Sequence, residues 1–246
     1  MRKIVCFIYI FISTTVSFQL YAQQNDTTLD ADLAKGKELL FYGKYKDAIL
    51  LFDKTLNHAE KLEDSKAITA CYNALSEAYN HTSQLEKALQ YAEKALQYSR
   101  REHNVQKKEE ADALFNLGIV QGKKRLSKES LENHTAALQI RQSFFKDDIF
   151  QIANSHFNIG VALHRQRRLP EAMKKFETAL ALELKDTPQR IILHADIYEA
   201  IGYINYDLGK FDKALSLFKK TLHLAQQVYK DEHPYYGKVY NEFGMI

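Results

Sequence analysis

Nine histidines are the residues of this 246-residue chain that most invite a search for metal chemistry. Two histidines four residues apart share a helix face and can hold a metal ion, and an HExxH motif adds a general base. The sequence contains neither pattern. His156 and His164 are eight residues apart, so they would lie on different turns of one helix, one at the edge of a core and one in a groove. We therefore predict no metal site and no cofactor.

Motifs for nucleophilic attack and phosphate binding are also missing. The nucleophile elbow GxSxG does not occur, and no pair of carboxylates stands isolated in an apolar setting, as general acid chemistry would require. The segment 118–123 reads GIVQGK, which is one residue shorter than a P-loop and lies within a predicted helix, so it cannot cradle a phosphate. These absences predict that the protein is not an enzyme. The alternative is an enzyme whose site has no recognisable motif, and a catalytic activity that one polar mutation abolishes would support it.

Cysteine chemistry is restricted to Cys6 and Cys71. Cys6 lies inside an apolar N-terminal run, too early to be the lipid-modified cysteine of a mature lipoprotein. If that run is removed, Cys71 cannot form an internal disulfide, so packing must stabilise the fold. We expect Cys71 to be a small buried residue on a helix, with a reactive thiol or an intermolecular disulfide as the alternative.

The N-terminus has the layout of a secretory signal peptide. A short positive start precedes a mostly apolar, uncharged run at 4–18, and Ala22 provides a small residue before a cleavage point. The apolar run of about 15 residues is short for a transmembrane helix, which needs roughly 20. We predict a cleaved signal peptide at 1–22, a disordered linker at 23–28, and export to the periplasm or the extracellular space. A chain anchored to the membrane by an uncleaved leader is the alternative.

The charge balance argues against two classes of partner. Lys and Arg number 34 and Asp and Glu 31, which gives a net charge of +3, and Arg2 and Lys3 belong to the predicted leader. The remaining chain is near +1, so there is no electrostatic reason to bind nucleic acid, or a membrane beyond the leader. Two basic clusters, 123–125 and 165–168, lie at predicted helix ends, where we expect the cations to complement the helix dipole.

An internal repeat organises the chain from residue 29 onward. Glycines recur every 42 residues in similar contexts such as FNLG and FNIG. These glycines are Gly118, Gly160, Gly202 and Gly244. A small residue recurs at Ala48, Ala88, Ser130, Ala172 and Ala214, twelve residues after the glycine position. Four residues further on, a mostly aromatic position holds Phe52, Ala92, His134, Phe176 and Phe218.

Apolar residues within each repeat recur at intervals of three to four, which predicts two successive helices. The breaks between them fall at Gly43, Ser83, 126–127, 167–168 and Gly209. Pro170, Pro188 and Pro234 lie where a helix would begin, and proline is tolerated there. We expect the glycine and the small residue to mark the closest approach of the two helices, and the aromatic to fill the space to the next pair. The predicted repeats are 29–64, 65–106, 107–147, 148–187, 188–231 and, in part, 232–246.

The repeat resembles the tetratricopeptide repeat (TPR), a helix–turn–helix unit with a basic length of about 34 residues. The pair of small residues, the following aromatic, and an Ala-Leu near the end of the second helix fall at the family's positions. The period of 42 residues and the segments 137–160 and 221–244 resemble the long-helix subtype of kinesin light chains. The resemblance implies an all-α fold, a right-handed α-solenoid of antiparallel helix pairs. The family's tryptophan is replaced here by Tyr72, Leu114, His156, Tyr198 and Tyr240.

A concave groove is the predicted functional surface, because stacked helix pairs curve and their first helices line the inner face. With the repeated glycine as position 8, positions 2, 6, 9 and 13 form one stripe in each repeat. The stripes are Ala70, Ala74, Glu77 and His81 in repeat two; Asp112, Asn116, Ile119 and Lys123 in repeat three; Asn154, Asn158, Val161 and Arg165 in repeat four; and Asp196, Ala200, Tyr203 and Asp207 in repeat five. The polar members and Tyr203 are the predicted partner-binding residues.

Asn116 and Asn158 occupy the same position in successive repeats. A side-chain amide carries a donor and an acceptor, so it can pair with a peptide backbone whatever its sequence. The resemblance to kinesin light chains implies that these asparagines contact a bound peptide; the alternative is that they serve solubility or neighbouring helices. Positions 2 and 6 carry no basic residue in repeats two to five, so binding of a peptide's terminal carboxylate, as in chaperone-tail-binding relatives, is not expected.

These features predict an exported scaffold that binds a protein or peptide segment in the TPR groove. The alternative is the input portion of a longer signalling protein, a membrane histidine kinase or a DNA-binding regulator, truncated here. The last stretch, with Tyr240, Phe243, Met245 and Ile246, has one bare apolar face. We expect that face to indicate either a fragment of a longer repeat protein or a homodimer contact through the C-terminal helix.

Overall fold

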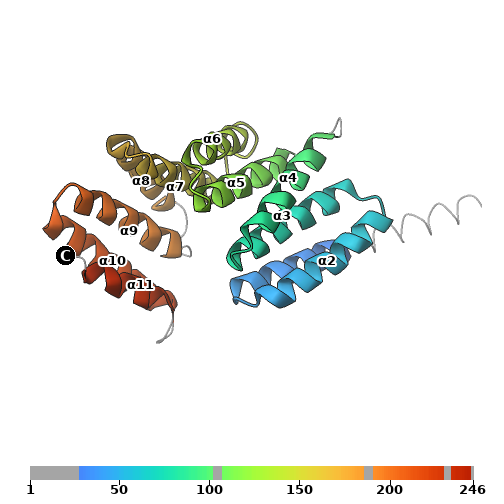
Figure 1. The fold of residues 1–246 in the computed structure, drawn as a ribbon, viewed down its shortest axis with the longest axis horizontal. Helices are drawn as coiled ribbons and strands as arrows, with labels where there is room; N and C mark the ends of the chain where they lie inside the picture. The colour runs from blue at the N-terminus through green and yellow to red at the C-terminus, as the bar shows by residue number, and fades with distance from the viewer. Residues whose placement is uncertain (1–27, 102–106, 186–190, 230–233, 245–246) are drawn as a thin grey trace, which may run out of the picture. The chain divides into compact units, whose positions relative to one another are not determined.

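The computed structural model describes residues 28–101, 107–185, 191–229 and 234–244, in which the only regular elements are α-helices (Figure 1). The first helix occupies residues 28–41. The labelled helices are α2 (Tyr45–Lys61), α3 (Ser65–His81), α4 (Leu85–Arg101), α5 (Lys107–Lys123), α6 (Ser127–Phe144), α7 (Ile149–Arg165), α8 (Leu169–Glu183), α9 (Ile191–Asp207), α10 (Phe211–Val228) and α11 (Pro234–Phe243). None of the described helices is both long and apolar enough to cross a membrane. The all-α prediction is confirmed.

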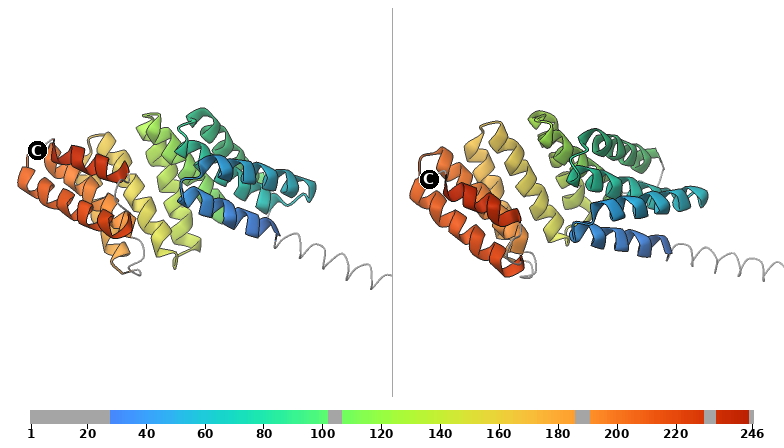
Figure 2. Two further views of the ribbon diagram at one scale, coloured as in Figure 1. Left: turned by 90° about the horizontal axis from the view of Figure 1, so that it is seen from below. Right: turned by 60° about the horizontal axis from the view of Figure 1, so that its bottom comes forward.

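Consecutive helices form antiparallel pairs, which Figures 1 and 2 show most clearly for α3 with α4 and for α9 with α10. Three-residue turns join the two helices of each pair, at 42–44, 82–84, 124–126, 166–168 and 208–210. The first helix begins at residue 28, one residue inside the predicted linker; otherwise each helix pair falls within one of the predicted repeat ranges, and α11 is the first helix of repeat six. Pro170 lies in the first turn of α8 and Pro234 begins α11, whereas Pro188 lies outside the described residues.

The chain forms two compact bodies, an N-terminal body at Met1–Glu109 and a C-terminal body at Glu110–Ile246. In the N-terminal body, Asn73 Nδ2 on α3 donates to Glu109 O at 3.0 Å and so holds the start of α5. The C-terminal body has a continuous apolar core, which includes Ile159, Phe176 and Ile197 from three successive helices. Most of the predicted groove residues lie in this second body.

A residue with positive φ lies in every turn between paired helices. Gly43 and Gly209 take this role with φ of 72° and 70°, as their predicted place at helix ends requires. Ser83, Arg125 and Arg167 do the same with φ of 60°, 64° and 61°, although their side chains make this conformation costly. The reason is the shared hydrogen-bond pattern: Leu126 N, for example, donates to Gln121 O at 2.9 Å across the turn, which requires the left-handed residue. The turn geometry is therefore imposed by the repeat and not by the local residue.

The repeated glycine makes room for the aromatic residue of its own helix pair. A Cβ placed on Gly160 would lie 2.5 Å from the Phe176 ring, and one placed on Gly202 would lie 2.5 Å from Phe218. Gly118 faces His134 in the same way, at 2.6 Å. The ring therefore packs within its own pair, and Phe176 also belongs to the core that includes Ile197 of the next pair. An aromatic ring needs one wall without a side chain, and the glycine sixteen residues earlier on the partner helix provides that wall.

Serine replaces glycine or alanine at two points of this packing. In repeat two, Ser76 stands at the glycine position and Ala92 at the aromatic position. The first helix therefore carries a larger residue, and the second helix a smaller one, than in the repeats with glycine and phenylalanine. Ser76 Oγ donates to Ala88 O at 2.8 Å, and Ser130 Oγ donates to Gly118 O at 2.7 Å. These contacts join the glycine position of the first helix to the small-residue position of the second helix, as expected for the closest approach of the two helices.

Candidate partner-binding groove

The predicted groove stripe lies along the first helices of the repeats, and its accessibility changes from one end to the other. Position 13 is exposed in all four repeats, at His81, Lys123, Arg165 and Asp207. Positions 2 and 6 are half-buried in repeats three to five. The stripe is therefore a partly sheltered row of polar groups that ends at exposed, mostly charged side chains.

The asparagine row belongs to the half-buried part of the stripe. On α7, Asn158 Nδ2 donates to Asn154 O at 2.9 Å and to Asn154 Oδ1 at 3.0 Å. The two amides are thus oriented by each other, and no donor within the described residues reaches Asn158 Oδ1. Asn116 occupies the equivalent half-buried position on α5 and also has an intramolecular interaction. The row can offer amide oxygens to a ligand, but part of its donor capacity is used within the fold.

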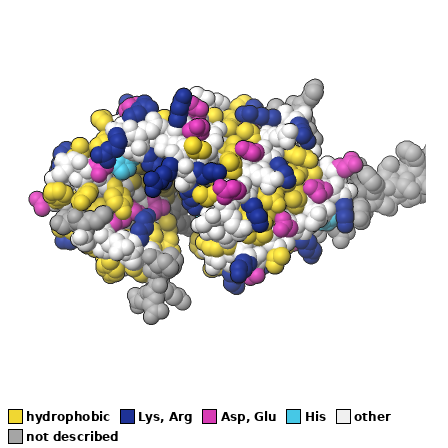
Figure 3. Space-filling view, in the orientation of Figure 1, with side chains coloured by type: hydrophobic (Ala, Val, Ile, Leu, Met, Phe, Trp, Pro, Cys, Tyr) yellow, Lys and Arg dark blue, Asp and Glu magenta, His cyan; other side chains and the backbone are white. Residues whose placement is uncertain are grey.

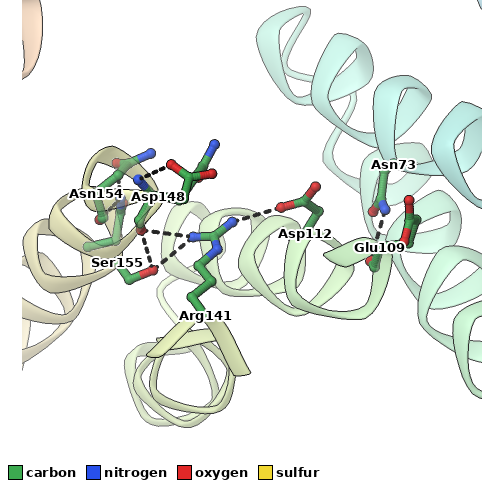
Figure 4. Close-up of polar contacts among 9 residues, drawn as sticks. Asn73, Glu109, Asp112, Arg141, Asp148, Asn154 and Ser155 are labelled. Carbon is green, nitrogen blue, oxygen red and sulfur yellow. Dashed lines mark hydrogen bonds and ion pairs between the residues drawn. The ribbon is translucent and has the colours of Figure 1, made fainter. Parts of the chain in front are cut away.

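Asp112, at position 2 of repeat three, is held by a buried arginine that sequence reasoning missed (Figure 4). Arg141 on α6 is 3% exposed, and its Nη2 donates to Asp112 Oδ1 at 2.9 Å. Its Nη1 donates to Ser155 Oγ at 2.8 Å and to a backbone carbonyl of α7 at 3.3 Å. The guanidinium also lies 4.6 Å from the centre of the Phe115 ring. Arg141 therefore ties α5, α6 and α7 together, and Asp112 serves this junction.

The position of Arg141 in the repeat holds buried residues in every complete repeat. The equivalent residues are Ala59, Ser99, Arg141, Glu183 and Ala225, each at most 3% exposed. Glu183 on α8 is 1% exposed, and its Oε2 lies 3.9 Å from His194 Nε2 on α9. Two neighbouring junctions thus bury side chains of opposite charge at equivalent places. The 42-residue period could have identified this position, because two charged residues stand there in a series that otherwise holds alanine and serine.

Repeat five contains a buried acidic cluster where α11 meets α9. Tyr235 Oη donates to Asp196 Oδ1 at 3.1 Å, and Lys238 Nζ contacts Glu199 Oε2 at 2.7 Å. Tyr203 Oη donates to Glu242 Oε1 at 2.9 Å. Glu199 and Glu242, which are 4% and 1% exposed, form a buried carboxylate pair that the sequence search did not find, and its setting is polar, with Lys238 and Tyr203 in contact. These two residues are 43 positions apart in sequence and meet only in the fold.

Burial changes the protonation of this cluster. Burial, and then the hydrogen bond and charge of Glu199, raise the pKa of the Glu242 carboxyl to about 8. Burial likewise raises the pKa of Asp196 to about 6, against the opposing effect of Lys238. Glu242 Oε2 has no hydrogen-bond partner as an ionised oxygen, and a proton on it could be donated to Glu199. Of the predicted groove residues in repeat five, Asp196 and Tyr203 therefore serve the docking of α11.

The exposed end of the stripe is connected to neighbouring side chains by polar contacts. Asp207 Oδ2 at the end of α9 lies 2.9 Å from His164 Nε2 and 2.9 Å from Arg167 Nη1. Arg165 lies across the end of α5, since a Cβ on Gly122 would lie 2.6 Å from its Nη1. Burial lowers the pKa of both Arg165 and Lys123, so these two cations are partly removed from water.

The remaining predicted residues lie in the N-terminal body. Glu77 and His81 are both exposed on α3. The His81 ring stacks on Tyr45 of the preceding pair, with ring centres 4.9 Å apart and planes 7° from parallel. This stack connects neighbouring turns of the N-terminal body.

Two buried histidines replace apolar residues in the C-terminal body. Burial lowers the pKa of His134 to about 3 and that of His156 to about 4, and nearby cations add to both shifts. Both rings are therefore neutral at physiological pH. Cys71 is buried and free, as predicted, and burial raises the pKa of its thiol to about 12. Across the described part of the chain, no three His, Cys, Asp or Glu side chains converge as metal ligands.

Two segments of the chain match known family profiles. Residues 68–143 and residues 194–235 each match a profile described as tetratricopeptide repeat. A search of functionally curated proteins returns no significant match.

Solved structures share the fold at low sequence identity. BtubC (BKLC) from P. vanneervenii is 18% identical, with a TM-score of 0.62, over 86% of this chain and 94% of that one. TPR-like repeats named as kinesin light chain from Podosopora anserina are 14% identical, with a TM-score of 0.59, over 82% and 97% of the two chains. The apo form of RapI is 19% identical, with a TM-score of 0.60, over 85% of this chain and 56% of RapI. Antiparallel pairs with the small–small–aromatic packing, the profile matches and these shared folds lead to one conclusion: the chain contains tetratricopeptide repeats and has the all-α fold of a TPR solenoid.

Proposed function

We propose that this TPR protein is an exported scaffold that binds a peptide or protein segment on the first-helix face of its C-terminal body. The observation that supports the proposal is the half-buried asparagine row of α5 and α7, in which Asn158 keeps an amide oxygen available. A sheltered amide oxygen can accept a backbone N–H from a peptide of any sequence. Lys123 and Arg165 at the exposed end of the row would favour an acidic side chain there.

A double substitution, Asn116→Ala with Asn158→Ala, tests the groove. Wild-type and variant proteins are used to recover partners from the extracytoplasmic fraction, and the recovered proteins are quantified by mass spectrometry. We expect the variant to lose partners that the wild type retains. The matched control is Asn57→Ala with Gln139→Ala, two exposed residues on second helices. Equal recovery by the wild type and the groove variant would contradict the assignment.

Export is the second element of the proposal, and it rests on the sequence of residues 1–22. Mass spectrometry of the N-terminus of protein purified from cells tests it. A chain that begins at Gln23 in the extracytoplasmic fraction supports cleavage, and a chain that retains Met1 in the membrane fraction contradicts it.

Self-association through α11 is a further element of the proposal. Tyr240 is 56% exposed on α11, and its ring centre lies 6.3 Å from that of Phe243, so the two rings form one accessible apolar face. Light scattering of wild-type protein and of Tyr240→Glu would distinguish a dimer from a monomer. A wild-type mass equal to one chain at high concentration contradicts self-association.

A further inference from the structure

The turns between paired helices in repeats three, four and five form one continuous edge of the C-terminal body. We define this basic edge as residues 123–129, 165–171 and 207–213. Gln166 Nε2 donates to Ser127 O at 2.8 Å and so joins the first two turns. His164 and Arg167 both contact Asp207 at 2.9 Å and join the second turn to the third. The three turns therefore lie side by side.

Positive charge is concentrated on this edge. Its three seven-residue segments contain nine Lys or Arg residues and four Asp or Glu residues, an excess larger than the net charge of +3 for the whole chain. Two of the carboxylates are already engaged: Glu171 by Arg168 at 2.6 Å, and Asp207 by its two partners. Figure 3 shows dark-blue Lys and Arg side chains across the face in view, with acidic and apolar side chains between them. The balance of the whole sequence therefore conceals a local surplus.

Two cations of the edge have lost part of their hydration, which costs free energy that a nearby anion would reduce. Arg165 and Lys123 are exposed overall, but neighbouring atoms still remove part of each side chain from water, which lowers the pKa of each. The Arg165 guanidinium covers Gly122, and within the described residues it forms an ion pair with no carboxylate. Cations at helix C-termini gain from the helix dipole, but that gain does not account for their number on the adjoining turns.

Large apolar side chains project between the cations. Leu126 is 41% exposed, Leu208 48% and Phe211 50%, and each lies in or directly after one of these turns. Isolated exposed apolar residues are ordinary in proteins. Apolar residues that alternate with cations on a row of projecting turns are different, because they match a partner with negative charges at its surface and an apolar layer below them.

We propose that the basic edge docks on an anionic phospholipid membrane. Lys and Arg would contact the headgroups, while Leu126, Leu208 and Phe211 would enter the boundary of the acyl region. Phe211 is the one aromatic among these three side chains, so successive nucleobases would find no row of rings to stack on, which argues against nucleic acid. The turns project from the ends of the helix pairs, whereas a bound peptide needs a groove.

Binding of the full chain to lipid vesicles tests the proposal. Co-sedimentation is measured with phosphatidylcholine vesicles that contain about 30 mol % phosphatidylglycerol, and with neutral phosphatidylcholine vesicles. The variant is Arg125→Gln, Arg167→Gln and Lys210→Gln. We expect the partition coefficient for the anionic vesicles to fall about 100-fold, because each cation near such a surface contributes about a fivefold factor. The matched control is Lys146→Gln, Lys185→Gln and Lys219→Gln, three exposed lysines outside the edge.

The leader is the same in every variant, so differences between variants report on the edge. The proposal is supported if the edge variant loses binding, the control variant keeps it, and wild-type binding weakens steeply with added salt. It is overturned if the two variants behave alike, or if wild-type protein binds neutral vesicles as tightly as anionic ones. Tighter binding to a DNA oligonucleotide or to polyglutamate than to anionic vesicles at equal salt would also overturn it. The salt series on wild-type protein decides the matter even if a variant fails to fold.

Discussion

His134 offers the sharpest test of how the repeat packs, because the protein contains its own reference. At the equivalent positions, Phe176 and Phe218 fill the space beside Gly160 and Gly202 with 1% and 0% exposure. His134 fills the same space beside Gly118 with 2% exposure, but its Nδ1 is buried without a hydrogen-bond partner. His134→Phe should therefore stabilise the C-terminal body.

Two terms determine the size of this effect. Removing a buried polar atom that has no hydrogen-bond partner raises the free energy of unfolding by about 1–3 kcal/mol at any pH where the ring is neutral. The pKa of His134 is lowered from 6.5 to about 3, so the unfolded chain takes up the proton first as the pH falls. Stability from this group is complete above pH 6.5 and is lost between 6.5 and 3. At pH 5 the loss is about 2 kcal/mol for a fully buried ring, and phenylalanine does not suffer it.

Urea unfolding followed by far-ultraviolet circular dichroism at pH 7.5 and pH 5 measures both terms. We expect His134→Phe to exceed the wild type at both pH values, and by a larger margin at pH 5. Part of the acid sensitivity should remain, because burial also lowers the pKa of His156. His223→Phe, at an exposed histidine, is the matched control. A His134→Phe protein that is less stable than wild type at pH 7.5, or that has the same margin at both values, would refute the reasoning.

Three other substitutions test separate features. Glu242→Gln should stabilise the docking of α11 by about 3 kcal/mol at pH 7 and by nearly nothing at pH 4.5, because a carboxyl with a raised pKa loses its contribution as the pH rises from 4.5 toward 8. Hydrogen exchange of residues 234–243 measures this effect. Arg125→Gly should raise stability by about 1 kcal/mol in thermal unfolding, since glycine accepts the φ of 64° without strain. Arg141→Met should cost about 3 kcal/mol in urea unfolding, because it leaves Asp112 and Ser155 without their donor; a change below about 0.5 kcal/mol would contradict the role of Arg141.

Much of the fold could be predicted from sequence because a repeat presents the same information several times. The helical periodicity, the turn positions and the small-residue positions recur every 42 residues. The helices of an irregular repeat can therefore be assigned from the pattern of the neighbouring repeats. The aromatic position was located correctly, but its contact with the glycine of its own helix pair was not predicted. Spacing along the chain does not say which of two adjacent helix pairs a ring will meet. Only the steric fit between Gly160 and Phe176 decides that question.

The candidate site was harder to predict, because its polar groups pair with residues that are far away along the chain. Asp112, Asp196, Tyr203 and Asp207 fall at the expected positions, but each contacts a partner 29 to 43 residues away. A stripe drawn on one helix cannot reveal such partners. The buried pair of Glu199 and Glu242 escaped for the same reason, since neither residue is near the other in sequence.

The departures from the repeat are as informative as the repeat itself. At one equivalent, buried position, consecutive repeats carry Ser99, Arg141, Glu183 and Ala225. Arg141 requires the carboxylate of Asp112 and the hydroxyl of Ser155, whereas Glu183 faces His194. Exchanging one pair for another would bury a charge against the wrong neighbour, which is costly in a low-dielectric core. The shared period therefore makes the helix pairs alike enough to stack, and these buried charges make each junction specific, so that the pairs, and the groove side chains they carry, occur in one order.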